Sequence, residues 1–438
     1  MRHRNSLWRW GLFSVAAALV VACSGDQTGP ADNGIDTTST DTTATDTTGA
    51  DTTGTDTSGV ATITLVDSVP IPPNYGIHDT FVRDGLAFVS AWNTGLRIYD
   101  VGNGIRGGSP QAPVLVGSVV TSAHNPSGGA SVHNSWWFHN PVAGEARYLF
   151  VGEEGPSGGV GVSATGDIHV VDVSDLSHPV EVGFYHMPAI NGDSAGTHNF
   201  WMDESRQILY AAYYNGGVVA LDVSGTLSGD LSSREIARIR PGGDGNTYVW
   251  GVQLAPDGSL YALDMVSGLW HLKLENGEFQ VLGGGNNVAD RWSSDLWVTS
   301  GFAYTGTWNK RGGTPGNAVK IWRLTSGGSP ELTDSIVVQN YGTVSDIEVS
   351  ADGKLLMVTA EQGTGSGLYI YSLANPAHPQ LVGQRLVNSV TAGLHTGTFA
   401  DIGGRRYIFA ARDPAAPALM IFEMSAPSLA VGEDRPVP

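Results

Sequence analysis

Four histidines of this chain stand in short segments that resemble one another. The segments read Ile77-His78-Asp79, Val132-His133-Asn134, Thr197-His198-Asn199 and Leu394-His395-Thr396. Neutral imidazole is a good ligand for iron, copper and zinc, and several imidazoles must converge to hold one ion. The pattern therefore indicates a metal site made by His78, His133, His198 and His395, if the fold brings the four segments together.

Three glutamates could complete such a site. Glu153, Glu154 and Glu361 each end an apolar stretch that precedes a glycine-rich segment. A carboxylate beside a ligating imidazole fixes the orientation and the tautomer of the ring. No His-Glu-x-x-His segment is present, so we assign no catalytic residue and leave open whether the protein is an enzyme. The candidate site comprises His78, Asp79, His133, Asn134, His198, Asn199, His395, Glu153, Glu154 and Glu361.

The elements that must position these residues repeat along the chain. Seven apolar segments of five residues read alike, and their starts lie 72, 50, 51, 50, 49 and 51 residues apart. A repeated unit of about fifty residues is typical of a propeller or an array. Alternating apolar residues and turns such as Arg83-Asp84-Gly85 predict four short strands per unit. The seven segments are Leu96–Asp100, Ile168–Asp172, Val218–Asp222, Leu269–Lys273, Val319–Arg323, Leu368–Ser372 and Leu419–Glu423.

Four antiparallel strands in each of seven units predict an all-β fold, a seven-bladed β-propeller. The seventh unit lacks a good outermost strand, whereas residues 61–70 read like the outermost strands expected at 113–121 and 179–187. We therefore expect the N-terminal strand to complete the last blade. Because the first strand of each blade lines the axis, the four histidines should lie on the adjacent blades seven, one, two and three.

The histidines allow three interpretations. A His-Asp or His-Asn pair at a strand start could hydrogen-bond the backbone of the next blade, which would be a purely structural role. The same residues could hold a metal ion, or they could bind a small ligand without metal. The histidines outside this pattern are expected on the surface, and three tryptophans that follow the pattern are expected between blades. These histidines are His124, His139, His169, His178, His186, His271 and His378, and the tryptophans are Trp136, Trp137 and Trp201.

One part of the repeat resembles a known family. Ile168-His169-Val170-Val171-Asp172-Val173-Ser174-Asp175, followed by His178-Pro179-Val180-Glu181-Val182-Gly183, is similar to the LVIVD repeat. Residues 368–383 and 96–117 match more loosely, and units three to five depart from the pattern. The resemblance implies a surface or envelope propeller over most of residues 61–424, and it implies no single chemistry.

The N-terminal residues predict export. Residues 1–22 combine a basic start with an apolar run from Leu12 to Val21, as in a secretory signal peptide. Leu19 to Cys23 resembles the lipobox of bacterial lipoproteins, which implies lipidation of Cys23, the single cysteine. Residues 23–60, rich in Thr and Asp, should form a disordered tether before the propeller at 61–438. We expect a protein that is lipid-anchored to the cell envelope, at the outer membrane or the cell surface.

Charge narrows the range of partners. Residues 61–438 contain 20 basic and 35 acidic residues, and an acidic domain is a poor partner for nucleic acid. The expected partners are the membrane, through the lipid anchor, and an unidentified protein or small molecule. We expect a monomer. The function expected from the sequence is a binding or interaction module of the cell envelope, with a metal-dependent enzyme as the alternative.

Overall fold

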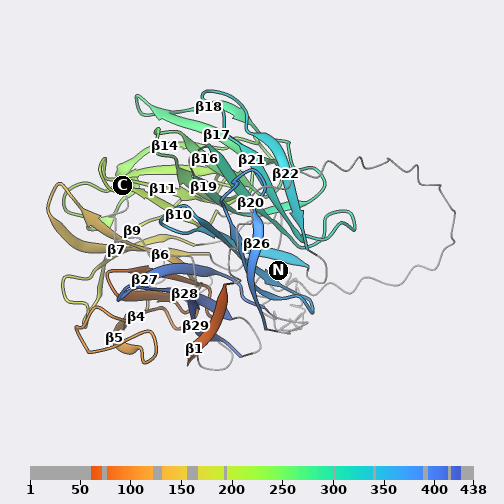
Figure 1. Cartoon of the computed structure of the whole chain (residues 1–438). Helices are drawn as coiled ribbons and strands as arrows, with labels where there is room; N and C mark the ends of the chain where they lie inside the picture. Colours follow the sequence, from red (N-terminus) through yellow and green to blue (C-terminus); the bar gives the residue numbers. More distant parts are fainter. Residues whose placement is uncertain are drawn as a thin grey trace, which may run out of the picture.

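The computed structural model describes residues 61–71, 76–121, 131–154, 166–191, 195–299, 301–338, 342–387, 393–412 and 416–425. The predicted signal peptide, Cys23 and the tether lie outside these residues, as does His124. Seven antiparallel sheets form a seven-bladed β-propeller (Figure 1), as the repeat predicts. The helical element of the described part is a single short turn, η1 (Ser232–Arg234), and none of its helices could span a membrane.

Each blade contains four strands in chain order from the axis outward, except that the last blade takes its outermost strand from the N-terminal side. Blade 1 comprises β2 (Asp79–Arg83), β3 (Leu86–Ser90), β4 (Leu96–Asp100) and β5 (Val114–Val119). Blade 2 comprises β6 (Val132–Asn140), β7 (Glu145–Glu153), β8 (Ile168–Asp172) and β9 (Val180–Tyr185), with the short parallel β13 (Gly229–Asp230) at its edge. Blade 3 comprises β10 (Phe200–Asp203), β11 (Ile208–Ala212), β12 (Val218–Asp222) and β14 (Glu235–Ile239).

The remaining blades follow the same plan. Blade 4 comprises β15 (Val249–Leu254), β16 (Leu260–Asp264), β17 (Gly268–Glu275) and β18 (Glu278–Gly284). Blade 5 comprises β19 (Trp292–Thr299), β20 (Phe302–Trp308), β21 (Ala318–Arg323) and β22 (Glu331–Val337). Blade 6 comprises β23 (Thr343–Val349), β24 (Leu355–Glu361), β25 (Gly367–Ser372) and β26 (Gln380–Leu386). Blade 7 comprises β27 (Gly397–Ile402), β28 (Arg405–Arg412), β29 (Ala418–Ser425) and β1 (Thr62–Pro70).

Tight turns set the register of the inner hairpins. Asp84 and Gly85 join β2 to β3 with φ of 51° and 70°, which is the two-residue hairpin turn that matches strand twist. Gly403 and Gly404 make the same turn in blade 7 with φ of 59° and 74°. The seven apolar segments found by periodicity are the third strands of the seven blades. These strands are β4, β8, β12, β17, β21, β25 and β29.

The ring closes where the sequence predicts. Strand β1 pairs antiparallel with β29, from Thr62 opposite Ser425 to Pro70 opposite Ala418 (Figure 1). Ile63 is buried in the core that blade 7 shares with blade 6. The first and last described strands therefore belong to one sheet, which links the two ends of the repeat without a disulfide.

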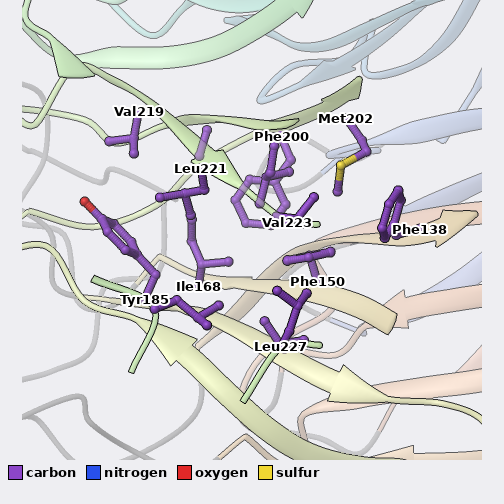
Figure 2. Packing of buried hydrophobic residues seen from close by; sticks show 14 of the residues in the cluster. Phe138, Phe150, Ile168, Tyr185, Phe200, Met202, Val219, Leu221, Val223 and Leu227 are labelled. Atoms are coloured by element: carbon purple, nitrogen blue, oxygen red, sulfur yellow. The ribbon is translucent and has the colours of Figure 1, made fainter. Parts of the chain in front are cut away.

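Apolar side chains are packed between neighbouring blades. In the described residues, a separate cluster of buried residues joins each adjacent pair of blades. Figure 2 shows the cluster between blades 2 and 3, where Phe150 and Ile168 approach Phe200 and Leu221. Radial packing of this kind holds the blades in place, so residues at equivalent strand positions form levels around the axis. The inner strands contact one another in the order β2, β6, β10, β15, β19, β23, β27 and back to β2.

Candidate metal centre

Backbone pairing places the four histidines at one level. The backbone N–H groups of His78, His198 and His395 donate to carbonyl oxygens at the ends of the second strands, those of Ser90, Ala212 and Ala411, at 2.8, 2.9 and 2.8 Å. His133 stands one residue after Val132, which pairs with Glu153 at the end of β7. The equivalent positions of blades 4, 5 and 6 are Trp250, Ser294 and Ser345.

Six aromatic rings close around the axis at this level. Centroids of His395 and His78 are 4.2 Å apart, those of His78 and His133 4.0 Å, and those of His133 and His198 3.9 Å. Trp250 continues the ring at 4.1 Å from His198, and Trp308 follows at 5.2 Å from Trp250. Trp308 lies 6.0 Å from His395, which completes the circle. The four histidines thus form one arc and two indoles the other.

Polar atoms converge on the histidine arc. One ligand atom from each of His78, His133 and Glu154 lies within 4.8 Å of the others. The Nε2 atoms of His78 and His395 are 3.0 Å apart, and His78 Nε2 is 3.7 Å from Glu154 Oε2. Glu361 Oε2 lies 3.2 Å from His395 Nδ1. The hydroxyl of Tyr214 donates a short hydrogen bond to Glu154 Oε1.

Burial keeps three of the imidazoles neutral. His78, His133 and His198 are 5%, 1% and 3% exposed. Loss of solvation lowers the pKa of each well below its usual value, and neighbouring imidazoles lower it further. Neither ring nitrogen of His133 or of His198 has a hydrogen-bond partner among the described residues. An unpartnered buried polar group costs about 1–3 kcal/mol, so these rings are available for a ligand that would compensate this cost.

The residues that follow the histidines carry the bonds between blades. Asn199 Nδ2 donates to Asp295 Oδ1 at 2.8 Å, and Thr396 Oγ1 donates to the backbone oxygen of His78 at 2.5 Å. Asp346 Oδ2 accepts from the backbone of Gly397 at 2.7 Å. These bonds fit the structural interpretation of the His-Asp and His-Asn pairs, and they come from the residue after the histidine in blades 3 and 7.

A level of acidic groups lies next to the histidines. Asp79 is partly exposed, and burial together with Asp346 raises its pKa to about 7. Asn134 is buried at the equivalent position of blade 2. Burial raises the pKa of Asp295 to about 6, and burial and the nearby Asp295 raise that of Asp346 well above its usual value. This level is polar, and burial favours the neutral form of its carboxyl groups.

Glu153 points away from the arc, unlike Glu154. Its carboxylate accepts a short hydrogen bond from Thr121 Oγ1 and lies 3.4 Å from His169 Nε2. His169 Nδ1 also lies 2.8 Å from Glu181 Oε1. Burial lowers the pKa of His169, but the bonds to Glu153 and Glu181 outweigh burial and raise it to about 9. This imidazole is paired with two carboxylates away from the arc, so it is not part of the candidate metal centre.

Two expectations about single histidines are therefore wrong. His169 and His271, which the sequence places on the surface, are 0% and 1% exposed. His271 Nδ1 lies 2.8 Å from the backbone oxygen of Gly328, and its ring stacks on Tyr261. Both residues lie on third strands, whose side chains alternate between two neighbouring blades and are covered on both faces. His178 and His378 are exposed, as expected.

The three tryptophans pack between blades, and two of them also approach the axis. Trp137 packs on Phe88 between blades 1 and 2, as expected. Trp136 and Trp201 are partly buried and pack against the clusters between blades 2 and 3 and between blades 3 and 4, as expected; their centroids are 5.4 Å apart. Trp201 also lies 6.0 Å from Trp297, which belongs to the non-adjacent blade 5. That contact requires both rings to face the axis, so an aromatic level lies further along the channel.

Strained backbone is found beside the histidines. Trp92 and Tyr214 have φ of 45° and 42°, values that bulky residues seldom adopt. Trp92 stacks on His78 at 5.3 Å, and Tyr214 lies 5.2 Å from His198. Such strain concentrates at functional sites, where the surrounding structure holds it in place. The sequence signal for these residues was limited to their place at the ends of second strands.

Comparison with known proteins identifies the repeat. Residues 162–187, which include β8 and β9, match the family model of the LVIVD repeat. The chain carries an LVIVD repeat. No curated protein matches the sequence of this chain. Its fold is similar to the crystal structure of the WD40 β-propeller domain of Doa1, with a TM-score of 0.52 and 10% identity, over 82% of this chain and 96% of that one. At this identity the likeness concerns the fold alone.

Proposed function

We propose that this LVIVD propeller is a metal-binding module of the cell envelope, and that His78, His133, His395 and Glu154 hold a transition-metal ion at its axis. The observation that carries the proposal is the pair of unpartnered nitrogens on the buried ring of His133, beside two further imidazoles and a carboxylate. Imidazole with one carboxylate suits iron, copper or zinc, whereas calcium and magnesium prefer oxygen ligands alone.

The separation of the ring nitrogens is consistent with shared coordination. With a metal–nitrogen distance of about 2.1 Å, neighbouring ligands of an octahedral ion lie about 3.0 Å apart and those of a tetrahedral ion about 3.4 Å apart. The Nε2 atoms of His78 and His395 are 3.0 Å apart. They could therefore occupy adjacent positions on one six-coordinate ion with little movement.

Neighbouring groups already orient these donors. Glu361 Oε2 lies 3.2 Å from His395 Nδ1, on the side of the ring opposite to the Nε2 atom that faces His78. Tyr214 holds one oxygen of Glu154, and Trp92 packs on the ring of His78. Carboxylate and hydroxyl partners of this kind raise the affinity of ligands for a metal. His198 lies next to His133 and would be a neighbour of the ion and not one of its ligands.

The test is metal analysis of the full chain, purified without chelator from the cell fraction that contains it. We expect about one equivalent of iron, copper or zinc, and its loss in the double variant His78→Ala/His133→Ala. His178→Ala, an exposed histidine outside the axis, is the matched control and should keep the metal. A wild-type protein that binds no metal after supplementation, while its circular dichroism shows a folded sheet protein, would exclude the proposal.

The envelope location is a separate part of the proposal and depends on residues 1–23. Lipidation of Cys23 would anchor the chain, since two or three acyl chains bind a bilayer stably. Mass spectrometry of the mature N-terminus should show a lipid-modified cysteine. In a Cys23→Ser variant we expect the protein to leave the membrane fraction, and retention in that fraction with an unmodified N-terminus would contradict the anchor.

A further inference from the structure

A second part of the axial channel, away from the histidines, is lined by aromatic side chains. The inner strands of blades 1, 2, 3 and 5 carry Phe81, Trp136, Trp201 and Trp297, and strand pairing places these residues at equivalent positions. The ring centroids of successive members are 5.2, 5.4 and 6.0 Å apart, so the four rings touch and form one continuous aromatic wall. Because blades 3 and 5 are not adjacent, the contact between Trp201 and Trp297 requires this wall to face the axis.

Polar residues complete the level of the aromatic wall. Glu348 of blade 6 and Thr398 of blade 7 occupy the equivalent positions of their strands. Glu348 Oε1 accepts a hydrogen bond from the backbone N–H of Phe399 at 3.0 Å. Blade 4 contributes Gln253, whose Nε2 is occupied by the backbone oxygen of Val298 at 3.0 Å. Glu348 is therefore the ionisable residue that the aromatic level presents to the channel.

The acidic level lies between the histidines and the aromatic wall. Asn199 of blade 3 donates to Asp295 of blade 5 at 2.8 Å, so the side chains of this level also point to the axis. Burial, together with Asp346 and Asp79, raises the pKa of Glu348 to about 8, which shows that the carboxyl groups of the two levels act on one another. Neither level contains a basic side chain. A cation in this part of the channel would be attracted by each carboxyl group and would favour the ionised forms that burial disfavours.

Solvent reaches the channel at both levels. The four rings of the aromatic wall and the side chain of Glu348 are partly exposed, and so are Asp79, Asn199 and Asp346 of the acidic level. The four axial histidines, in contrast, are only 1–6% exposed. Because neighbouring strands cover the inner strands on their other sides, the exposed surface of these side chains faces the axis. The channel is thus accessible from the acidic level to the aromatic wall and is closed by the histidines.

The combination of aromatic rings and carboxyl groups favours an organic cation. The face of an indole ring attracts a cation, and the attraction strengthens where water is excluded. A quaternary ammonium group has no N–H donor, so it loses no hydrogen bond when it packs against such rings. Basic side chains of the neighbouring hairpins are already paired, Arg83 with Glu204 at 2.6 Å and Arg406 with Asp401 at 2.8 Å. They therefore add no unpaired positive charge that would repel the ligand.

From this arrangement we infer that the channel between the acidic level and the aromatic wall binds a quaternary ammonium compound. The indoles of Trp136, Trp201 and Trp297 pack against its methyl groups, and Glu348 is its counter-ion. The site is separate from the candidate metal centre, and the inference does not depend on the proposed metal-binding function.

Choline is the probe, and isothermal titration calorimetry of the full chain is the measurement. The control ligand is the uncharged carbon analogue of choline, in which a tert-butyl group replaces the trimethylammonium group. We expect choline to bind at one site and the analogue to bind about tenfold or more weakly. Equal affinity for the two compounds, or no binding of choline, would overturn the inference. Displacement of choline by an equal concentration of calcium would show a site for inorganic cations and would also overturn it.

Variants locate the site. Trp297→Leu keeps an apolar side chain and removes one indole, and Glu348→Gln keeps the size of the side chain and removes the counter-ion. Each should weaken choline binding about tenfold. Trp270→Leu, at a partly exposed position on the third strand of blade 4, and Glu331→Gln, on the outermost strand of blade 5, make the same exchanges away from the axis and should bind choline like wild type. Unchanged affinity in both Trp297→Leu and Glu348→Gln would overturn the inference.

The metal centre and the cation site are distinguished by one further variant. His78→Ala/His133→Ala should lose the metal and bind choline with the affinity of wild type, because neither histidine belongs to the two levels that line the cation site. Loss of choline binding in this variant, with the fold retained in circular dichroism, would place the ligand at the histidines and overturn the inference.

Discussion

His78 and His395 are 317 positions apart in the chain, and their Nε2 atoms lie 3.0 Å from each other. The contact exists because blade 7 lies next to blade 1 after the ring has closed. In this contact the Nδ1 atom of His395 lies beside Glu361, and the two imidazole rings face each other with their Nε2 atoms. Closure of the propeller therefore brings His395 to the candidate metal centre.

Metal should stabilise the fold through His133. A ligand present at about one hundred times its dissociation constant adds about 2.7 kcal/mol to the free energy of unfolding. We expect a gain of this order for wild type when iron(II) or zinc is added, and none for His133→Ala. The measurement is chemical denaturation with and without metal. His271→Ala, which removes another buried histidine, should lower stability and yet keep the gain from metal; a gain in His133→Ala equal to that of wild type would contradict the assignment.

Glu361 should tune the affinity of the site through His395. Removing the carboxylate in Glu361→Ala releases the imidazole from its orientation, so we expect metal affinity to fall about 10–100-fold. Glu361→Gln keeps an acceptor oxygen and should lose less. Glu348→Gln changes a glutamate of the same blade that does not contact the histidines, and it serves as the control. Competition with a chromogenic chelator measures all three, and equal affinities in Glu361→Ala and wild type would remove Glu361 from the site.

Stability should fall as pH rises through neutrality. Burial, with Asp346 and Asp79, raises the pKa of Glu348 to about 8, whereas an unfolded glutamate has a pKa of about 4.3. Between these values the folded state holds a proton that the unfolded state has released, so the free energy of unfolding decreases as pH increases. Urea denaturation from pH 5 to pH 8 should show this slope, and Glu348→Gln should flatten it. Parallel curves for wild type and variant would exclude Glu348 as a source.

The conformation of the loop after β4 should depend on the carboxylate of Asp100. Its buried carboxylate accepts from the backbone N–H groups of Gly102, Gly104, Arg106 and Gly108 at 2.7–3.1 Å. Burial raises the pKa of Asp100, but these bonds outweigh burial and lower it to about 2. The contribution is therefore complete above about pH 4 and is lost as pH falls toward 2.

Replacing Asp100 by alanine leaves several of these donors without an acceptor, and we expect a loss of about 3 kcal/mol at pH 7. Asp257→Ala, at an exposed turn with one backbone bond, should cost about 0.5 kcal/mol. Thermal and urea unfolding of both variants measure the difference. Similar losses in the two variants would show that the loop does not need the carboxylate.

Ring closure by β1 should be weakened by polar substitutions on the buried face of the strand and not by those on its exposed face. Ile63 is 6% exposed and packs in the core shared by blades 6 and 7, whereas Leu65 is 37% exposed. We expect Ile63→Asp to lower the free energy of unfolding by about 3 kcal/mol and Leu65→Asp to change it by no more than about 0.5 kcal/mol. Ile63→Asp should also weaken metal binding, because the contact between His78 and His395 depends on closure. Unchanged stability in Ile63→Asp would argue against β1 as the closing strand.

Local patterns were sufficient for the architecture. The third strands repeat at nearly equal spacing, and turns such as Asp84-Gly85 separate the hairpins, so period and turn chemistry alone predict seven four-stranded blades. The similarity of residues 61–70 to the outer strands likewise predicts β1 in blade 7. The level shared by His78, His133, His198 and His395 follows from the same repeat, because equivalent strand starts lie at equal height around the axis.

The identity of the ligand set was decided only by the tertiary structure. Glu153 and Glu154 are adjacent in the chain, and consecutive side chains near a strand end point to opposite sides. Packing turns Glu154 toward His78 and Glu153 toward His169. The periodicity of the sequence does not indicate which of the two glutamates faces which histidine. Trp250 and Trp308 likewise complete the aromatic ring opposite the histidines only because blades 4 and 5 lie across the axis from them. The repeat therefore determines the positions around the ring, and three-dimensional packing determines which side chains face one another there.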